Sequence, residues 1–288
     1  MDIKAIGMGL AFALIWSSAF TSARFIVTQA PPLSISALRF LLAGLIAIGI
    51  ARALGQTWRL TRGQWRSVVI FGICQNAIYL GLNFVAMQTV EASLAAIIAS
   101  TMPLLVGLIG WLVLKDKLPL IGVVGLVTGF AGVGLIMGAR LSGQVDLMGL
   151  ALCVTAALAL AVATLAMRGA SSGGNLMMVV GLQMLVGCAV LAVCAALFET
   201  MVVDWNLELG LAFAYTTLVP GILATFIWFV LVARIGAVKA ATFHFLNPFF
   251  GVAIAAVLLG ETLGVWDLVG VVVIAAGILA VQLSKQSA

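Results

Sequence analysis

Residues 99–118 read ASTMPLLVGLIGWLVLKDKL, and residues 244–263 read HFLNPFFGVAIAAVLLGETL. The two stretches align without a gap, with Pro103 opposite Pro248 and Asp116 opposite Glu261. The alignment extends over residues 83–134 and 228–279, where leucines and glycines also match. Apolar sequences resemble one another by chance, so the paired prolines and acids carry more weight than the raw identity. The chain therefore contains an internal repeat.

The composition identifies the medium in which this repeat folds. The 288 residues are 64% hydrophobic and 8% charged, against about a quarter charged in soluble domains. Each apolar run is long enough to cross a hydrocarbon core of about 30 Å. A membrane β-barrel would instead show alternating segments of about ten residues. The sequence predicts an all-α integral membrane protein with ten transmembrane helices, at residues 5–24, 34–52, 66–88, 92–113, 119–139, 147–168, 175–198, 209–232, 237–259 and 264–284.

The repeat divides these helices into two groups of five, at residues 1–140 and 141–288. Because five is odd, the second half must enter the membrane from the opposite side, which gives an inverted-topology repeat. Secondary transporters are commonly built in this way, with a substrate site near the midplane between the repeats. We therefore expect two inverted five-helix repeats around a central cavity.

The basic residues predict the orientation. If both termini are cytoplasmic, most lysines and arginines fall at cytoplasmic ends and loops, and only Arg24, Arg39 and Arg140 lie toward the other side. This bias is typical of multi-pass proteins and predicts cytoplasmic N- and C-termini. The net charge of +5 then reflects topology in a lipid bilayer, not a nucleic-acid partner. The acids on the non-cytoplasmic side are Glu91, Asp146, Glu199, Asp204, Glu208, Glu261 and Asp267.

Polar residues in the ninth helix are the first candidates for a substrate site. His244 and Asn247 precede Pro248 near the middle of this span. Since proline lacks an N–H, the carbonyl of His244 loses its helical partner, and exposure of these groups to lipid would be costly. They should face the interior, either lining a cavity or forming a packing kink. Pro103 should break the fourth helix in the same way.

Two further helices carry candidates. Gly72, Asn76, Tyr79 and Asn83 share one face of the third helix at α-helical spacing. This face reads as a cavity wall or as a line of interhelical hydrogen bonds. Trp16, deep in the first helix, is either an aromatic wall or part of the core. The glycines of the fifth helix have a spacing that favours close helix packing; they are Gly125, Gly129 and Gly132.

Several kinds of chemistry are missing from the sequence. No carboxylate lies at mid-depth in a span, so a permanently cationic drug would lack a counter-ion and carboxylate-based proton exchange would lack a carrier. His244 is the one mid-membrane group that could titrate near neutral pH, so proton coupling would have to use it. Nucleotide-binding, zinc-protease and serine-hydrolase motifs do not occur. We expect no enzyme, no metal and no cofactor.

The sequence also resembles a known family. WSSAF at residues 16–20 and the two stretches around Pro103 and Pro248 are similar to the EamA-type members of the drug/metabolite transporter superfamily. In that family each half carries a mid-helix proline followed by an apolar run that ends in an acid and leucine. The chain further resembles the bacterial inner-membrane exporters of that family that act on aromatic amino acids. The resemblance implies export of aromatic and other neutral amino acids.

The sequence therefore predicts a secondary transporter of the bacterial inner membrane that exports small amphiphilic metabolites by alternating access. One alternative is an exporter of neutral or weakly basic drugs, and another is a non-transporting membrane scaffold or receptor. A monomer would suffice, because the repeat supplies both halves of the pathway. Pro103 and Pro248 would serve as flex points. The expected substrate-binding residues are Trp16, Asn76, Tyr79, Asn83, His244 and Asn247.

Overall fold

The chain folds into ten membrane spans. The computed structural model describes residues 3–140, 146–166 and 173–284, with the side chains of 140, 237 and 238 excepted. Within these ranges every regular element is a helix, and ten helices or runs of helices are long and apolar enough to cross a membrane. This confirms the predicted all-α fold with ten spans.

Six spans are single helices and four are composite. The single helices are α1 (Ile3–Val27), α2 (Pro32–Ala53), α7 (Leu120–Arg140), α8 (Leu147–Ala166), α9 (Leu176–Phe198) and α14 (Val265–Ser284). The third span runs through α3 (Arg62–Phe71), η1 (Gly72–Leu80) and α4 (Gly81–Ala86), and the fourth through α5 (Ala92–Ser100) and α6 (Met102–Leu112). The eighth comprises α10 (Leu207–Leu218), η2 (Val219–Leu223) and α11 (Ala224–Ile235), and the ninth comprises α12 (Ala237–Ala241), η3 (Thr242–Leu246) and α13 (Asn247–Leu259). The third and fourth spans of each repeat are therefore interrupted alike.

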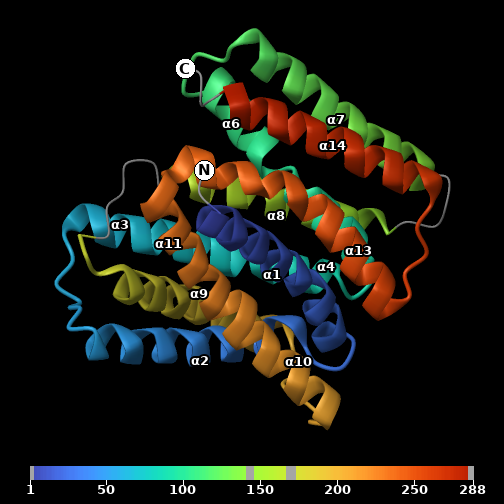
Figure 1. The fold of residues 1–288 in the computed structure, drawn as a ribbon. Helices are drawn as coiled ribbons and strands as arrows, with labels where there is room; N and C mark the ends of the chain where they lie inside the picture. The colour runs from blue at the N-terminus through green and yellow to red at the C-terminus, as the bar shows by residue number, and fades with distance from the viewer. Residues whose placement is uncertain (1–2, 141–145, 167–172, 285–288) are drawn as a thin grey trace.

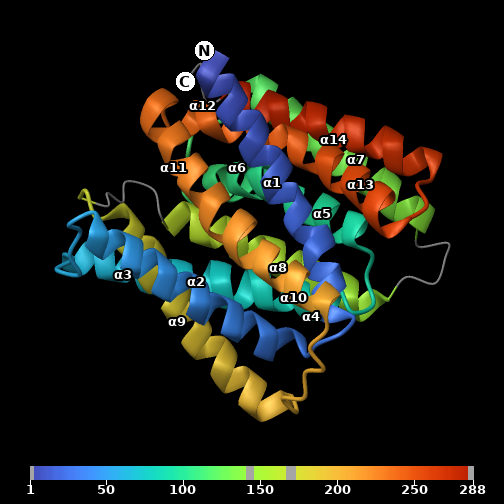
Figure 2. The ribbon, with the colours of Figure 1, turned by 60° about the horizontal axis from the view of Figure 1, so that its bottom comes forward.

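Helices from the two repeats pack in corresponding pairs. Helix α2 packs along α9 at one edge of the bundle, and α7 along α14 at the opposite edge (Figures 1 and 2). Between these edges α5 packs against α13. The second span thus meets the seventh, the fourth meets the ninth and the fifth meets the tenth. All nine residues of α5 are buried, as expected for a central helix that is apolar on every side.

The contact between α7 and α14 depends on glycine. A Cβ atom on Gly277 would meet the backbone nitrogen and Cα of Gly129, and one on Gly132 would lie 3.0 Å from the Gly270 carbonyl oxygen. Only residues without a side chain allow two helix backbones to approach this closely. The prediction that the glycines of the fifth helix serve packing is confirmed.

Two helices receive their N-terminal caps from other spans. The Glu199 carboxylate, just after α9, accepts hydrogen bonds from the N–H groups of Leu33 (2.8 Å) and Ser34 (2.7 Å) at the start of α2. The Glu261 carboxylate, after α13, accepts from the N–H groups of Ala92 (2.8 Å) and Ser93 (3.0 Å) at the start of α5. The first N–H groups of a helix have no intrahelical partner and favour a nearby anion. The acid that ends the second copy of the repeat motif is thus a helix cap.

The remaining spans that begin at this end are capped locally. Asp146 accepts from the Met148 N–H at the start of α8 (3.0 Å), and also from the Thr89 hydroxyl (2.6 Å). The Thr89 bond is the main reason that the pKa of this carboxyl group is lowered. The Asn206 side chain accepts from Leu209 in α10 (2.8 Å). In the first turn of α14, the Asp267 carboxylate accepts from the N–H of Gly264, the residue before the helix (3.0 Å). Each of the five even-numbered spans therefore has a side-chain acceptor at its start.

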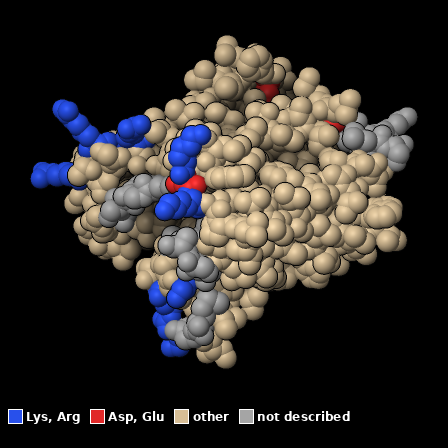
Figure 3. Space-filling model, turned by 90° about the horizontal axis from the view of Figure 1, so that it is seen from above, with Lys and Arg blue, Asp and Glu red and all other residues tan. Residues whose placement is uncertain are grey.

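Charge is distributed unequally between the two ends of the bundle. In Figure 3 most of the visible lysine and arginine side chains project from one end of the molecule. The N- and C-terminal ends of the described chain lie near each other in Figures 1 and 2. This arrangement agrees with an even number of spans, and the cytoplasmic location of the termini stays a prediction.

Removal of the Glu261 cap should destabilise the protein. Glu261→Ala leaves two N–H groups of the central helix without their acceptor, so we expect the free energy of unfolding to fall by about 1–3 kcal/mol. Thermal unfolding of the purified protein in detergent would measure this loss as a lower melting temperature. Asp204→Ala, which removes an exposed carboxylate at the same end, is the control. Equal melting temperatures for the two variants would contradict a capping role.

Candidate functional site

The ninth span is broken at the predicted proline. The 3₁₀ segment η3 ends at Leu246, and α13 begins at Asn247 with Pro248 in its first turn. The predicted break is therefore confirmed. The expectation that the His244 carbonyl has no partner is wrong, because it accepts a hydrogen bond from the Asn247 N–H. The tighter 3₁₀ turn supplies the donor that Pro248 cannot.

The fourth span is broken in the same way at Pro103. Helix α5 ends at Ser100 and α6 begins at Met102. The backbone N–H and the side-chain hydroxyl of Thr101 both donate to the Ile98 carbonyl, at 3.0 Å and 2.6 Å respectively. The Ser100 hydroxyl donates to the Ala96 carbonyl (2.6 Å). Local hydrogen bonds therefore satisfy backbone groups that lipid could not.

Four rings, which we call the aromatic group, gather where the first span meets the eighth and ninth. The centroid of the Trp228 ring of α11 lies 4.7 Å from that of the Phe12 ring of α1 and 5.0 Å from that of the His244 ring. The Trp228 and His244 rings meet edge-to-face, with an angle of 86° between their planes. Phe12 also lies 5.5 Å from His244 and 5.7 Å from Trp16. The Nδ1 atom of His244 is 3.2 Å from the Ala241 carbonyl oxygen. The imidazole is thus held by two rings and its own backbone.

A polar contact joins α1 to the break in the ninth span. The Ser17 hydroxyl donates to the backbone carbonyl of Asn247 (3.2 Å). The Oδ1 atom of Asn247 is buried and has no hydrogen-bond partner. Buried polar atoms in native proteins are nearly always bonded, so an unpaired acceptor calls for an explanation, such as a ligand group. Asn247 therefore offers an acceptor one turn from His244.

The third span differs from the regular helix that the sequence predicts. Residues Gly72–Leu80 form a π-helix, whose wider turn changes which side chains share a face. The Asn76 amide donates to the Gln183 carbonyl on α9 (2.9 Å), and the Asn83 amide donates to the Tyr79 carbonyl in its own span (2.8 Å). All three predicted residues are buried. Asn76 uses its amide N–H in an interhelical bond, the packing alternative left open by the sequence.

The predicted substrate-binding residues thus form two sets. Trp16, His244 and Asn247 come together around α1 and the ninth span. Asn76, Tyr79 and Asn83 lie in the third span, which packs against α8 and α9. Among the described residues, no hydrogen bond or ring contact joins the two sets. Their role in substrate binding stays a prediction.

Sequence reasoning missed Phe12 and did not anticipate the surroundings of Trp228 and Arg39. Phe12 lies one helical turn before Trp16 in α1, and this i, i+4 spacing is a signal that the sequence contains. Trp228 has no such local signal, because only the fold brings α11 to α1. Arg39 was assigned to the non-cytoplasmic side, but it is buried within α2. An arginine inside an apolar run could have indicated an interior position.

Comparison with known proteins gives the same organisation in two halves. Residues 3–138 and 147–283 each match the EamA-like transporter family. The uncharacterized transporter YvbV of Bacillus subtilis is 25% identical over 280 residues, covering 96% of this chain and 92% of that protein. The uncharacterized inner membrane transporter YedA of Escherichia coli is 28% identical over 293 residues, covering 98% and 92%. A solved crystal structure of a protein with 22% identity superposes with a TM-score of 0.69 over 100% of this chain and 99% of its own, which shows the same fold.

The interhelical bond of Asn76 can be tested by stability. Asn76→Ala removes the donor to the Gln183 carbonyl, so we expect the free energy of unfolding to fall by about 0.6–2 kcal/mol. Gln75→Ala, a neighbouring amide that is only partly buried, should change it less. The melting temperatures of the two purified variants in detergent would measure the difference. If Gln75→Ala were the more damaging change, the packing role of Asn76 would be excluded.

Proposed function

Because the chain belongs to the EamA-like transporter family, it is a multi-pass membrane transporter, and we propose that it exports small amphiphilic metabolites. The proposed substrates are aromatic and other neutral amino acids. The proposed location is the bacterial inner membrane, with both termini in the cytoplasm. A single copy of the chain would suffice, since both repeats are present.

One observation carries the choice of substrate: an unpaired buried acceptor next to an aromatic group. The free Oδ1 of Asn247 could accept a hydrogen bond from a substrate ammonium group. The rings of Trp16, Trp228 and His244 lie close by and suit an aromatic substrate side chain, since stacked or edge-on ring pairs are each favourable by about 0.5–1.5 kcal/mol. An amphiphilic molecule with one polar end and one apolar end matches this pairing.

Alternating access is the proposed mechanism. The fourth and ninth spans are broken at Pro103 and Pro248, and α5 packs against α13. Two interrupted spans that face each other across the repeat interface resemble the discontinuous helices of secondary transporters. Rocking of one repeat against the other would bend the spans at these positions. Tyr79, Asn76 and Asn83 would line the path from the third span.

Uptake by purified protein would test the substrate directly. Liposomes that contain only this protein should take up labelled phenylalanine and threonine faster than empty liposomes. The measurement is made with and without a pH gradient, because uptake without the gradient would establish a facilitator in which proton coupling is unnecessary. Absence of uptake under both conditions would contradict the amino-acid proposal and favour an exporter of neutral or weakly basic drugs.

His244 should affect transport more than stability. His244→Ala removes one ring of the aromatic group that is proposed to hold the substrate side chain, so we expect phenylalanine uptake to fall about tenfold, a loss of about 1.4 kcal/mol. Membrane insertion should be unchanged. Phe249→Ala is a matched control because this ring lies on α13 and is 56% exposed. Equal uptake by both variants, at pH 6 and at pH 8, would remove His244 from the mechanism.

A further inference from the structure

Arg39 is a charged residue inside a membrane span. It lies about 10 Å along α2 from the helix start at Pro32, at 1.5 Å per residue. Its side chain is 5% exposed, so it does not extend to water at the membrane surface. Charged residues within spans are rare, costly and usually functional. The position of Arg39 therefore needs a physical explanation.

The surroundings of Arg39 provide rings but no counter-ion. The guanidinium carbon lies 4.4 Å from the centroid of the Phe40 ring and 5.0 Å from that of Phe84 in the third span. The Nε and Nη2 atoms are buried and have no hydrogen-bond partner. Glu199, the carboxylate that caps the same helix, accepts its hydrogen bonds from Leu33 and Ser34. No carboxylate in the described part of the chain bonds to Arg39.

The two rings compensate only part of the cost of burying this cation. Each cation–π contact contributes about 0.5–2 kcal/mol, the larger values where water is excluded. An isolated buried charge costs several kcal/mol, and its unpaired N–H donors add to this cost. Aromatic faces also offer no hydrogen-bond acceptor to the N–H groups at the edge of the guanidinium plane. Along that edge, Nε and Nη2 present two parallel donors, the geometry that fits the two oxygens of a carboxylate.

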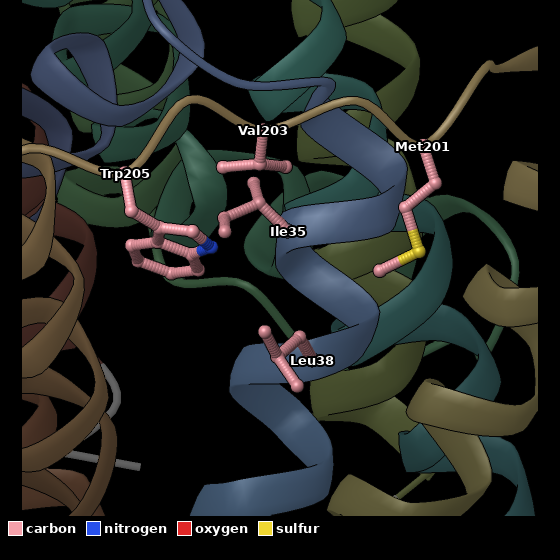
Figure 4. A pocket seen from close by; sticks show the side chains of 5 residues that line it. All are labelled: Ile35, Leu38, Met201, Val203 and Trp205. Carbon is pink, nitrogen blue, oxygen red and sulfur yellow. The ribbon is translucent and has the colours of Figure 1, made fainter.

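A pocket lies at the end of α2 nearest to Arg39. Figure 4 shows it between α2 and the segment that follows α9, lined by Ile35, Leu38, Met201, Val203 and Trp205. Its volume is about 270 Å³. Ile35 lies one helical turn before Arg39 on the same face of α2. The pocket is apolar and carries an indole ring, so it suits the hydrocarbon part of a ligand; Arg39 does not itself line the pocket and lies one turn deeper along α2.

We propose that Arg39 binds the carboxylate of the transported substrate, at a station in the half of the membrane where α2 begins. The ligand class is a monocarboxylate with an apolar body. The inference deepens the proposed function and rests on it for the identity of the carboxylate as a substrate group. The site lies on α2, away from the aromatic group around α1.

Ligand-induced stabilisation tests this site without requiring transport. The probes are phenylacetate and its neutral isostere 2-phenylacetamide, added to the purified protein in detergent at constant ionic strength. Phenylacetate at about tenfold excess over its dissociation constant should raise the melting temperature by about 3–6 °C, and the amide should not. Arg39→Gln should abolish the shift. Arg39→Lys keeps the positive charge but lacks the two parallel N–H donors, so it should reduce the shift in melting temperature.

Arg24→Gln is the matched control for loss of one positive charge. Arg24 lies in α1, and its guanidinium already donates to the Met87 carbonyl, so the phenylacetate shift should persist in this variant. If Arg39→Gln cannot be isolated in a folded state, the proposal is tested by the shifts that phenylacetate and 2-phenylacetamide cause in wild type and in Arg39→Lys. An equal shift with 2-phenylacetamide, or an undiminished shift in either Arg39 variant, would overturn the proposal.

An anionic lipid headgroup could also bind to Arg39, and a separate measurement distinguishes a lipid from a substrate. Stabilisation by added phosphatidylglycerol alone, with none by phenylacetate, would overturn the assignment to substrate. Failure of the proposed function has a different signature: liposomes would take up no phenylalanine, while phenylacetate would still stabilise wild type and not Arg39→Gln. Uptake of phenylalanine that is unaffected by Arg39→Gln would exclude Arg39 from the transport path.

Discussion

Hydrocarbon offers no hydrogen-bond partner to the backbone, and the rest of this structure depends on that constraint. Five spans begin at the same end of the bundle, and each has an acceptor for its first N–H groups. Two of these acceptors come from another repeat: Glu199 and Glu261 in the second half cap α2 and α5 in the first. A cap of this kind satisfies the donors and also ties the halves together at one end. Four of the acids at this end therefore have a structural role: Asp146, Glu199, Glu261 and Asp267.

The same constraint determines what the broken spans can do. At Pro248 the chain tightens into a 3₁₀ turn in which the Asn247 N–H takes up the His244 carbonyl, and beside Pro103 the Ser100 and Thr101 hydroxyls bond the Ala96 and Ile98 carbonyls. A break repaired in this way is stable without a ligand, so it can bend without exposing backbone to lipid. At Pro248 it also means that the freed carbonyl is not available for recognition. Recognition then depends on side chains, above all on those with buried polar atoms that have no hydrogen-bond partner.

The sequence was sufficient for the features that depend on composition and spacing. Ten apolar runs, a repeated proline and a glycine pattern predicted the spans, both breaks and the packing of α7 on α14, because each follows from local chemistry in lipid. The π-helix at Gly72–Leu80 was not predictable, since no proline or glycine pair marks it out. Partners distant in sequence were also missed: Trp228 reaches the aromatic group, and Asn76 reaches Gln183, only through the fold. The burial of Arg39 was not anticipated, because a count of charges by side does not ask whether a charge lies within a span.

The charges inside the bundle bear on the choice between an amino acid and a drug. A weakly basic drug would meet a buried cation at Arg39 with no carboxylate in the described part of the chain bonded to it, and like charges in a medium of low dielectric constant repel strongly. A zwitterion has the complementary pattern, because its carboxylate suits the unpaired guanidinium edge and its ammonium group suits the unpaired Oδ1 of Asn247. The two groups lie on different spans, α2 and α13, so one substrate could use them in succession along its path. Unpaired groups of opposite character on two spans are a reason to favour a neutral amino acid over a cationic compound.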